Sequence, residues 1–189
     1  MVSLASLGRT QHMRVVAGKY RGKRLDPPSR IKARPTTDFA KEGLFNILQH
    51  SIELNGVSVL DLFAGSGGIS MEFISRGAGS LVSVDTDRQA IDFMQRLARE
   101  MQLDNWHIIN ADVFSFLSTY AHKLDIIFAD PPFRFGKHEK LVRKVMANDF
   151  LKKGGMFILE HPKDVDLSDE PGYLKTRNYG NLKFSFFRA

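Results

Sequence analysis

The sequence contains no cysteine among its 189 residues, which excludes a disulfide framework and any zinc site built on thiolates. It also lacks a run of about eighteen apolar residues, so no transmembrane helix is predicted. Its first twelve residues lack a basic stretch followed by a long apolar one, which argues against a secretory signal. The six histidines show no metal-ligand spacing. We therefore expect a cytoplasmic protein of one domain, with no membrane partner and no bound metal.

Positive charge is concentrated in one segment near the start of the chain. The formal net charge is +6, yet Arg14 to Arg34 holds eight basic residues against the single acid Asp26, so this segment carries +7 and the rest −1. Such a segment beside a neutral body is typical of a protein that binds a polyanion, although a solvated basic loop is the alternative. We predict that residues 13–35 form a basic hairpin and loop that bind RNA. The residues expected to contact RNA there are Lys19, Tyr20, Arg21, Lys23 and Arg24.

Strand-like and helix-like runs alternate along most of the chain. Residues 1–12 show no periodicity, and we expect them to be a disordered leader or extension outside the fold. Residues 14–25 predict two short strands around a glycine-containing turn, and TTDFAKEGLFNILQH predicts an amphipathic helix with threonine at its cap. From residue 57, buried-strand runs such as VSVLDLF, LVSVD and LDIIFAD are separated by helical runs. Residues 36–189 therefore predict a doubly wound, mostly parallel sheet with an antiparallel C-terminal hairpin.

The first of these strands ends in an acid and a glycine-rich turn, DLFAGSGG at residues 61–68. Glycines allow a ligand to approach the backbone N–H groups at a helix N-terminus, and ligands bind at the carboxyl end of open α/β sheets. Asp85 ends the next strand, where a carboxylate can accept hydrogen bonds from both hydroxyls of an adenosine ribose. Asp112 follows the third strand, near where adenine would lie, although aspartate is also a favoured helix N-cap.

The acid at the strand tip distinguishes this turn from the similar turn of NAD enzymes. Asp61 would repel a pyrophosphate, but it can pair with a ligand that carries a positive amino group, such as S-adenosylmethionine. A chain of 189 residues also leaves little room for a separate substrate domain. The turn therefore predicts an S-adenosylmethionine site, with a nicotinamide oxidoreductase and a ligand-free turn as weaker alternatives. The turn residues expected at the cofactor are Asp61, Phe63, Ala64, Gly65, Ser66 and Gly67.

The tetrapeptide Asp130-Pro131-Pro132-Phe133 directly follows the fourth strand. Two prolines cannot continue a sheet, so the chain turns out beside the ligand site. An exocyclic base amine is a poor nucleophile, and two acceptors, the Asp130 carboxylate and the Pro131 carbonyl, can hold its N–H groups and orient its lone pair. Phe133 can stack on the base, a contact worth roughly 1–3 kcal/mol. We predict a methyltransferase acting on a base amine, with Arg134 gripping a nearby phosphate.

DLFAGSG, VSVD, NAD and ADPPF occur here in the order and spacing of the class I amino-methyltransferases. From Met13 onward the chain resembles the bacterial RsmD-type small-subunit ribosomal RNA guanine-N2 methyltransferases. The specific matches are RVVAGKYRGKRL, RPTTDFAKEGLFNIL and KTRNYG. The resemblance implies a seven-stranded Rossmann-like sheet, S-adenosylmethionine as methyl donor, and N2-methylguanine in assembling small-subunit rRNA as product.

The resemblance also implies a role for each site residue. Two positions depart from the usual pattern, Lys41 where arginine is common and Asp85 where glutamate is common, and both keep their charge. By this resemblance, Asp61, Gly65 and Gly67 bind the methionine end of the cofactor, Asp85 its ribose and Asp112 its adenine. Asp130 and Phe133 bind the target base. Arg34 and Thr36 belong to a segment that covers the cofactor and guides RNA.

The tetrapeptide fixes the kind of atom that is methylated and leaves the base open, because it also occurs in enzymes that act on adenine and cytosine amines. A DNA or RNA adenine-N6 methyltransferase therefore stays as an alternative, as does a non-catalytic ribosome-assembly factor that keeps the fold. We expect a monomer whose partner is small-subunit rRNA, either free or in a partly assembled ribosomal particle.

Overall fold

The structure, a computed structural model, describes residues 13–31 and 36–189. The predicted leader 1–12 and Arg34 lie outside the described residues. No helix in the described part is long and apolar enough to cross a membrane. The elements in chain order are β1 Met13–Arg14, β2 Arg24–Leu25, α1 Asp38–Gln49, β3 Ser58–Leu62, α2 Gly68–Ser75, β4 Ser80–Asp85, α3 Arg88–Glu100, β5 Trp106–Asn110, α4 Val113–Thr119, β6 Leu124–Ala129, α5 His138–Met146, β7 Leu151–Pro162, β8 Tyr173–Tyr179 and β9 Leu182–Arg188.

Seven of these strands form one sheet in the order β5-β4-β3-β6-β7-β9-β8, which confirms the predicted Rossmann-like, seven-stranded architecture. β3 to β7 run parallel, and β9 pairs antiparallel with both β7 and β8. The chain enters at β3, adds β4 and β5 on one side, and then adds β6 and β7 on the other. The strand order reverses between β3 and β6, and ligands of open α/β sheets bind at such switch points.

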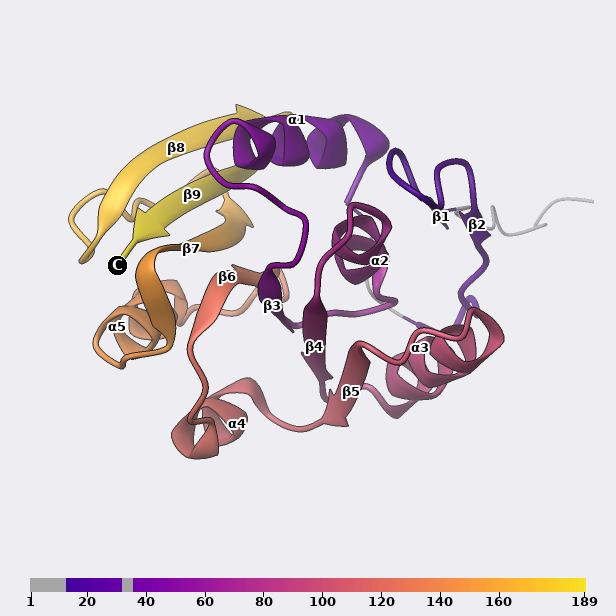
Figure 1. Cartoon of the computed structure of the whole chain (residues 1–189). Coiled ribbons are helices and arrows are strands. Elements are labelled where there is room, and N and C mark those ends of the chain that lie inside the picture. Colours follow the sequence, from indigo (N-terminus) through magenta and orange to yellow (C-terminus); the bar gives the residue numbers. More distant parts are fainter. Residues whose placement is uncertain (1–12, 32–35) are drawn as a thin grey trace, which may run out of the picture.

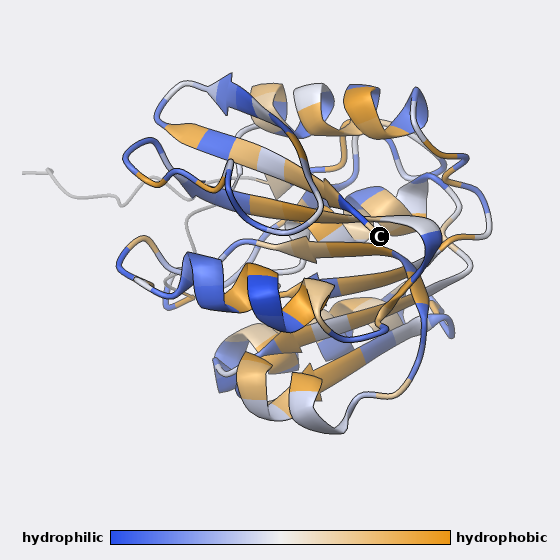
Figure 2. Cartoon of the chain, turned by 90° about the vertical axis from the view of Figure 1, so that its left-hand side faces the viewer, coloured by the Kyte–Doolittle hydropathy of each residue, from blue (hydrophilic) through white to orange (hydrophobic). Residues whose placement is uncertain are grey.

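Helices cover both faces of the sheet (Figure 1). α1, α2 and α3 bury their apolar side chains in a core on one face, and α4 and α5 bury theirs in a second core on the other. Figure 2 shows why the layers form: the strands are mostly apolar, whereas the helices alternate apolar and polar residues. In α1, Leu44, Phe45 and Leu48 are fully buried, as expected from their helical spacing.

The N-terminal residues form the short hairpin that the sequence predicts. β1 and β2 are antiparallel but have two residues each, and turns occupy most of the chain between them. Gly18 and Gly22 both have positive φ, so the backbone bends before a longer ladder can form. The α1 helix begins as predicted, because the Thr37 side chain accepts a hydrogen bond from the Ala40 N–H and caps it.

Candidate active site

The glycine-rich turn lies at the carboxyl end of β3 and leads into α2. Phe63, Gly65 and Gly67 all have positive φ, a conformation that glycine adopts without strain. A Cβ on Gly67 would also come within 3.0 Å of the Met94 and Trp106 side chains, so there is no room for a larger residue. The turn thus presents its backbone with few side chains in the way, as a bound ligand would require.

Asp85 holds this turn in place from the neighbouring strand. Its Oδ2 accepts a hydrogen bond from the Gly65 N–H (2.8 Å), and its Oδ1 accepts one from the Asp87 N–H (2.8 Å). The predicted ribose acceptor is therefore next to the predicted turn, with its carboxylate already oriented by two backbone donors. Each carboxylate oxygen has a further lone pair that can accept from a ligand hydroxyl.

Asp61 lies beneath the turn and is 1% exposed. Its carboxylate accepts a short hydrogen bond from the Ser70 hydroxyl, which lies 2.7 Å from the Ser83 hydroxyl. The Trp106 Nε1–H donates to that same Ser83 oxygen (2.8 Å). Burial raises the pKa of Asp61 to about 7. The hydrogen bond from Ser70 lowers this pKa, and the negative charge of Asp85 raises it. This supporting chain of hydroxyls was not predicted, because no sequence signal links its members.

Asp130 follows β6 next to this turn, and its N–H donates to the Leu62 carbonyl at the end of β3 (3.2 Å). The structure therefore brings the two predicted acids, Asp61 and Asp130, to adjacent strand ends. Burial raises the pKa of Asp130 well above its ordinary value, and the charges of Glu160 and Asp61 raise it further. Perturbed acids of this kind are concentrated at functional sites.

Glu160 is a site residue that the sequence prediction missed. It lies near the end of β7, and its Oε2 accepts a hydrogen bond from the hydroxyl of Thr36 (3.3 Å), the predicted cofactor-covering residue. The available signal was an acid near the end of a fifth buried strand, which would place it at the same edge of the sheet as Asp61, Asp85 and Asp130.

The side chains after Asp130 differ sharply in exposure. Pro131 is buried, whereas Arg134 is exposed and Phe133 is 76% exposed. Phe135 was not predicted as a site residue, yet its ring contacts Phe63 edge-on at 5.1 Å. It therefore packs the tetrapeptide loop against the glycine-rich turn, while Phe133 remains available for a stacking partner.

Asp112 lies at the carboxyl end of β5 and caps α4. Its side chain accepts a hydrogen bond from the Ser115 N–H (3.0 Å), as expected for an aspartate N-cap. Asp112 therefore has the helix-capping role that the sequence analysis gave as an alternative. The remaining oxygen lies at the same edge of the sheet as the turn, so a role at the adenine stays a prediction.

The basic N-terminal segment is fixed to α2 by its backbone. The Lys19 N–H donates to the Ser75 carbonyl (2.7 Å) and the Tyr20 N–H to the Ser75 hydroxyl (2.9 Å). The Val16 N–H donates to the buried Glu72 carboxylate (2.7 Å), and Lys41 lies 3.4 Å from that same carboxylate. The predicted RNA-contacting cations are all exposed, namely Lys19, Arg21, Lys23 and Arg24.

This segment also touches the glycine-rich turn. Met13 of β1 is buried, and its sulfur accepts a hydrogen bond from the Ser66 hydroxyl (3.2 Å). A Cβ on Gly68 would meet that sulfur at 3.2 Å. The hairpin and the turn are therefore in direct contact, so the surface that carries the exposed cations is held in a fixed position relative to the predicted cofactor site.

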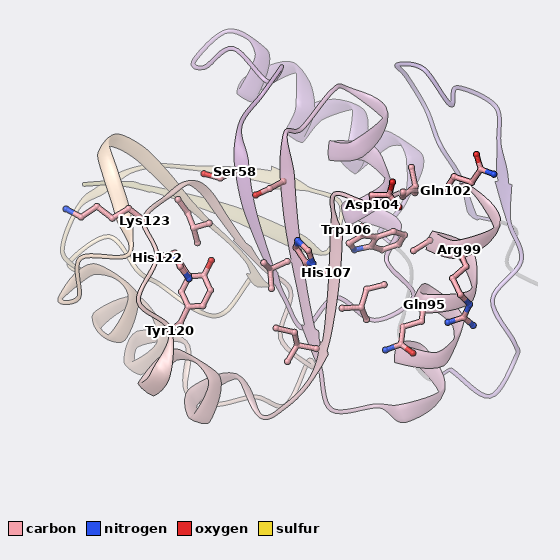
Figure 3. Close-up of a pocket in the computed structure, with 17 residues that line it drawn as sticks. Ser58, Gln95, Arg99, Gln102, Asp104, Trp106, His107, Tyr120, His122 and Lys123 are labelled. Carbon is pink, nitrogen blue, oxygen red and sulfur yellow. The ribbon is translucent and has the colours of Figure 1, made fainter.

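A hollow of about 1270 Å³ lies elsewhere, over the β5 edge of the sheet (Figure 3). Its lining includes Ser58, Ser80 and Lys123, which lie at or before the amino ends of β3, β4 and β6, together with Arg99 from α3. None of the predicted site residues that the structure describes lines it. The carboxyl edge, with its clustered acids, is thus the better candidate site. Among the described residues, no three His, Cys, Asp or Glu side chains are arranged to hold a metal.

The fold is that of the Rossmann-like S-adenosylmethionine-dependent methyltransferases. Its defining features are a parallel sheet whose strand order reverses, a glycine-rich turn that follows an acid at the switch point, and an antiparallel terminal hairpin. A Thermus thermophilus structure described as hypothetical protein TTHA0928 superposes with a TM-score of 0.81 at 27% identity, covering 93% of this chain and 99% of that one. The T. thermophilus 16S rRNA N2 G1207 methyltransferase RsmC, solved with AdoMet and guanosine, superposes with a TM-score of 0.70 at 25% identity, covering 99% of this chain and 52% of that one.

The family model described as "Conserved hypothetical protein 95" matches residues 13–188. The chain belongs to this family. It is also 31% identical to the Escherichia coli K12 protein named ribosomal RNA small subunit methyltransferase D, over 84% of this chain and 79% of that protein. These findings confirm the predicted resemblance to RsmD-type proteins.

Proposed function

We propose that the protein transfers a methyl group from S-adenosylmethionine to the exocyclic N2 amine of a guanine in small-subunit ribosomal RNA. The observation that carries the proposal is the position of Asp130-Pro131-Pro132-Phe133, which leaves β6 beside the acid-tipped turn at the switch point of the sheet. The relatives support the choice of substrate: one is named a small-subunit rRNA methyltransferase, and one was solved with AdoMet and guanosine.

The residues at the turn fit S-adenosylmethionine. The backbone of Phe63, Ala64, Gly65, Ser66 and Gly67 would bind its methionine end, with Asp61 supplying negative charge beneath. Asp85 would accept from the ribose, Asp112 would lie at the adenine, and Thr36 would close over the site. Asp61 and Asp130 form no ion pair with a cation among the described residues, so a ligand with positive charge suits them. The bound cofactor supplies a methyl group on a positively charged sulfur.

The tetrapeptide would prepare the amine. The Asp130 carboxylate and the Pro131 carbonyl accept from its two N–H groups, and the exposed Phe133 ring stacks on the flipped base. The amine nitrogen bonds to the methyl carbon, the carbon–sulfur bond breaks with its electron pair left on sulfur, and one proton leaves the nitrogen for Asp130 or water. Positioning of this kind accounts for on the order of 7–11 kcal/mol of barrier reduction.

The N-terminal segment would bind the RNA backbone through the basic patch formed by Lys19, Arg21, Lys23 and Arg24, with Tyr20 and Arg134 adding contacts. Because the segment is fixed to α2, a bound RNA would be held at a set position relative to the tetrapeptide. If Lys23 contacts a phosphate, Lys23→Ala weakens RNA binding similarly for all sequences and lowers the slope of log affinity against log salt by about 1. Fluorescence anisotropy at several salt concentrations measures this slope, and an unchanged slope would remove Lys23 from the patch.

The test is to incubate the protein with labelled S-adenosylmethionine and either naked small-subunit rRNA or partly assembled subunits from cells that lack the enzyme. Digestion then identifies the labelled nucleoside. N2-methylguanosine supports the proposal, and the better substrate shows when in assembly the protein acts. A labelled adenosine or cytidine would refute the choice of base, and no label in any substrate would favour the non-catalytic assembly factor. Light scattering of the purified protein tests the proposed monomer.

A further inference from the structure

Asp130, directly after β6, and Glu160, near the end of β7, lie at the same level of two neighbouring strands. β6 and β7 are parallel, and Ala129 lies opposite Leu159, so the next residues along each strand are Asp130 and Glu160. Alternation along β7 puts Glu160 on the same face as Ile158, and alternation along β6 directs Asp130 to the face of Phe128. Both of those residues belong to the core under α1, α2 and α3. Two carboxylates therefore share the face on which the glycine-rich turn also begins.

The two carboxylates are close enough to interact. The charge of Glu160 is the second-largest cause, after burial, of the raised pKa of Asp130. No lysine or arginine of residues 13–31 and 36–189 forms an ion pair with Asp130. A pair of acids at a substrate site presents hydrogen-bond acceptors only, when both are ionised. The substrate that suits such a pair offers two adjacent N–H donors.

The edges of the bases differ in this respect. On guanine, the N2 amine is next to a ring N1 that carries a hydrogen, so two donors lie side by side. On adenine and cytosine, the exocyclic amine is next to a ring nitrogen with a lone pair. That lone pair would face a carboxylate oxygen with no hydrogen between them, and two lone pairs at hydrogen-bond distance repel each other.

We propose that Glu160 is the residue that selects guanine, by accepting the N1–H of the flipped base while Asp130 accepts an N–H of its N2 amine. This inference rests on the proposed function, because it assigns the base choice of that reaction to one side chain. Thr36 acts as a positioning residue, since its hydroxyl donates to Glu160 Oε2 and restricts the orientation of that carboxylate. The tetrapeptide selects the atom type, and Glu160 selects the base.

The sharpest probe is 2-aminopurine. This base keeps the N2 amine, but its N1 has a lone pair in place of the hydrogen and it lacks O6, so the dependence on Glu160 is what isolates the N1 contact. Two RNAs are synthesised that differ only at the nucleotide labelled in the experiment on rRNA, one with guanine and one with 2-aminopurine. We expect the wild-type protein to prefer guanine by at least roughly 100-fold in kcat/KM, as sites built around a substrate hydrogen bond do. Equal rates on the two RNAs would overturn the proposal without any variant.

The second part of the experiment repeats the comparison of the two RNAs with the Glu160→Gln variant. A glutamine amide offers both an acceptor for guanine N1–H and a donor for the 2-aminopurine N1, so we expect the preference to fall to roughly 10-fold or less. Thr36→Val should lower the same ratio in part. Glu100→Gln, an exposed change at the end of α3, is the matched control and should leave the ratio unchanged. A Glu160→Gln protein that loses both activities in equal proportion would show a structural role only and overturn the proposal.

The outcomes separate the two proposals. If the wild type makes N2-methylguanosine and the guanine preference does not depend on Glu160, the function stands and the role of Glu160 is refuted. If no N2-methylguanosine forms on any RNA, the function itself fails and the role of Glu160 fails with it. Chemical denaturation shows that each variant is folded, because it depends on neither the cofactor site nor the RNA.

Discussion

The two ends of strand β6 carry aspartates in opposite electrostatic surroundings. At its amino end, Asp125 accepts hydrogen bonds from the Ser58 N–H (2.8 Å), the Ser58 hydroxyl (2.7 Å) and Lys152 (2.7 Å). Burial pushes the pKa of Asp125 up, but these donors outweigh it and the pKa is lowered. At the carboxyl end, burial and two neighbouring acids raise the pKa of Asp130. The fold thus satisfies one acid for stability and leaves the other available for a substrate.

The most direct way to sharpen this comparison is to remove each acid in turn. We expect Asp130→Ala to lower turnover by roughly 10³-fold or more, because the amine loses its acceptor, while the affinity for S-adenosylmethionine survives. Asp125→Ala on the same strand is the control. It should keep turnover and lose about 1–3 kcal/mol of unfolding free energy. Single-turnover methylation and chemical denaturation give the two values, and normal turnover in Asp130→Ala would refute the mechanism.

The pH dependence of stability shows how much the burial of Asp61 at the carboxyl end of β3 destabilises the folded protein. The pKa of Asp61 is about 7 in the folded protein and near 3.8 when exposed, so the folded state retains a proton that the unfolded state has released. Wild-type stability, measured relative to Asp61→Asn, should therefore fall as pH rises from about 4 to 7 and then level off, by roughly 4 kcal/mol in total.

Urea denaturation of both proteins between pH 4 and 8 measures this difference. Since asparagine does not ionise, acids that do not interact with Asp61 contribute equally to both curves and cancel. The difference therefore reports the titration of Asp61 together with its coupling to Asp130 and Asp85. A stability difference that stays constant across this range would show that Asp61 is ionised throughout and that the end of β3 is not costly.

Asp85 should give an intermediate effect. Asp85→Ala leaves the Gly65 N–H and the Asp87 N–H without their acceptor, so the turn loses its support and the expected ribose contact is lost as well. We expect the dissociation constant for S-adenosylmethionine to rise about 10- to 100-fold, measured by calorimetry. Asp85→Glu keeps the charge; if it binds no better than Asp85→Ala, the charge alone does not account for the affinity.

The smallest effect is expected at Lys152, which is half exposed. Lys152→Ala removes a partner of Asp125, and surface pairs of this kind contribute about 0.2–1 kcal/mol. The stability that Asp125 provides is present above its ordinary pKa and is lost as pH falls through the lowered one, so the variant should differ from the wild type at pH 7 and converge with it in acid. Thermal denaturation at the two pH values checks this, and a change in turnover would contradict the division between the two ends.

The sequence predicted the site residues that lie at the ends of strands. Asp61, Asp85 and Asp130 each end a buried apolar run, and parallel strands bring such ends together. Glu160 ends a similar run and was overlooked because no glycine-rich turn or proline pair marks it. The chain from Asp61 through Ser70 and Ser83 to Trp106 was beyond prediction, since it depends on how α2, β4 and β5 are packed. The same holds for the contacts of Glu72 and Ser75 with the backbone of the N-terminal segment.

The length of helix α2 fixes the distance between the glycine-rich turn and the basic N-terminal segment. The helix begins at the glycine-rich turn and ends at Ser75, which holds the basic segment, so its eight residues space the two by about 12 Å. One inserted residue would advance this spacing by about 1.5 Å and rotate the helix end by about 100°, which would point Ser75 away from the backbone it holds. An insertion in a surface loop would leave this spacing unchanged, whereas an insertion within α2 would separate the two surfaces that the helix joins.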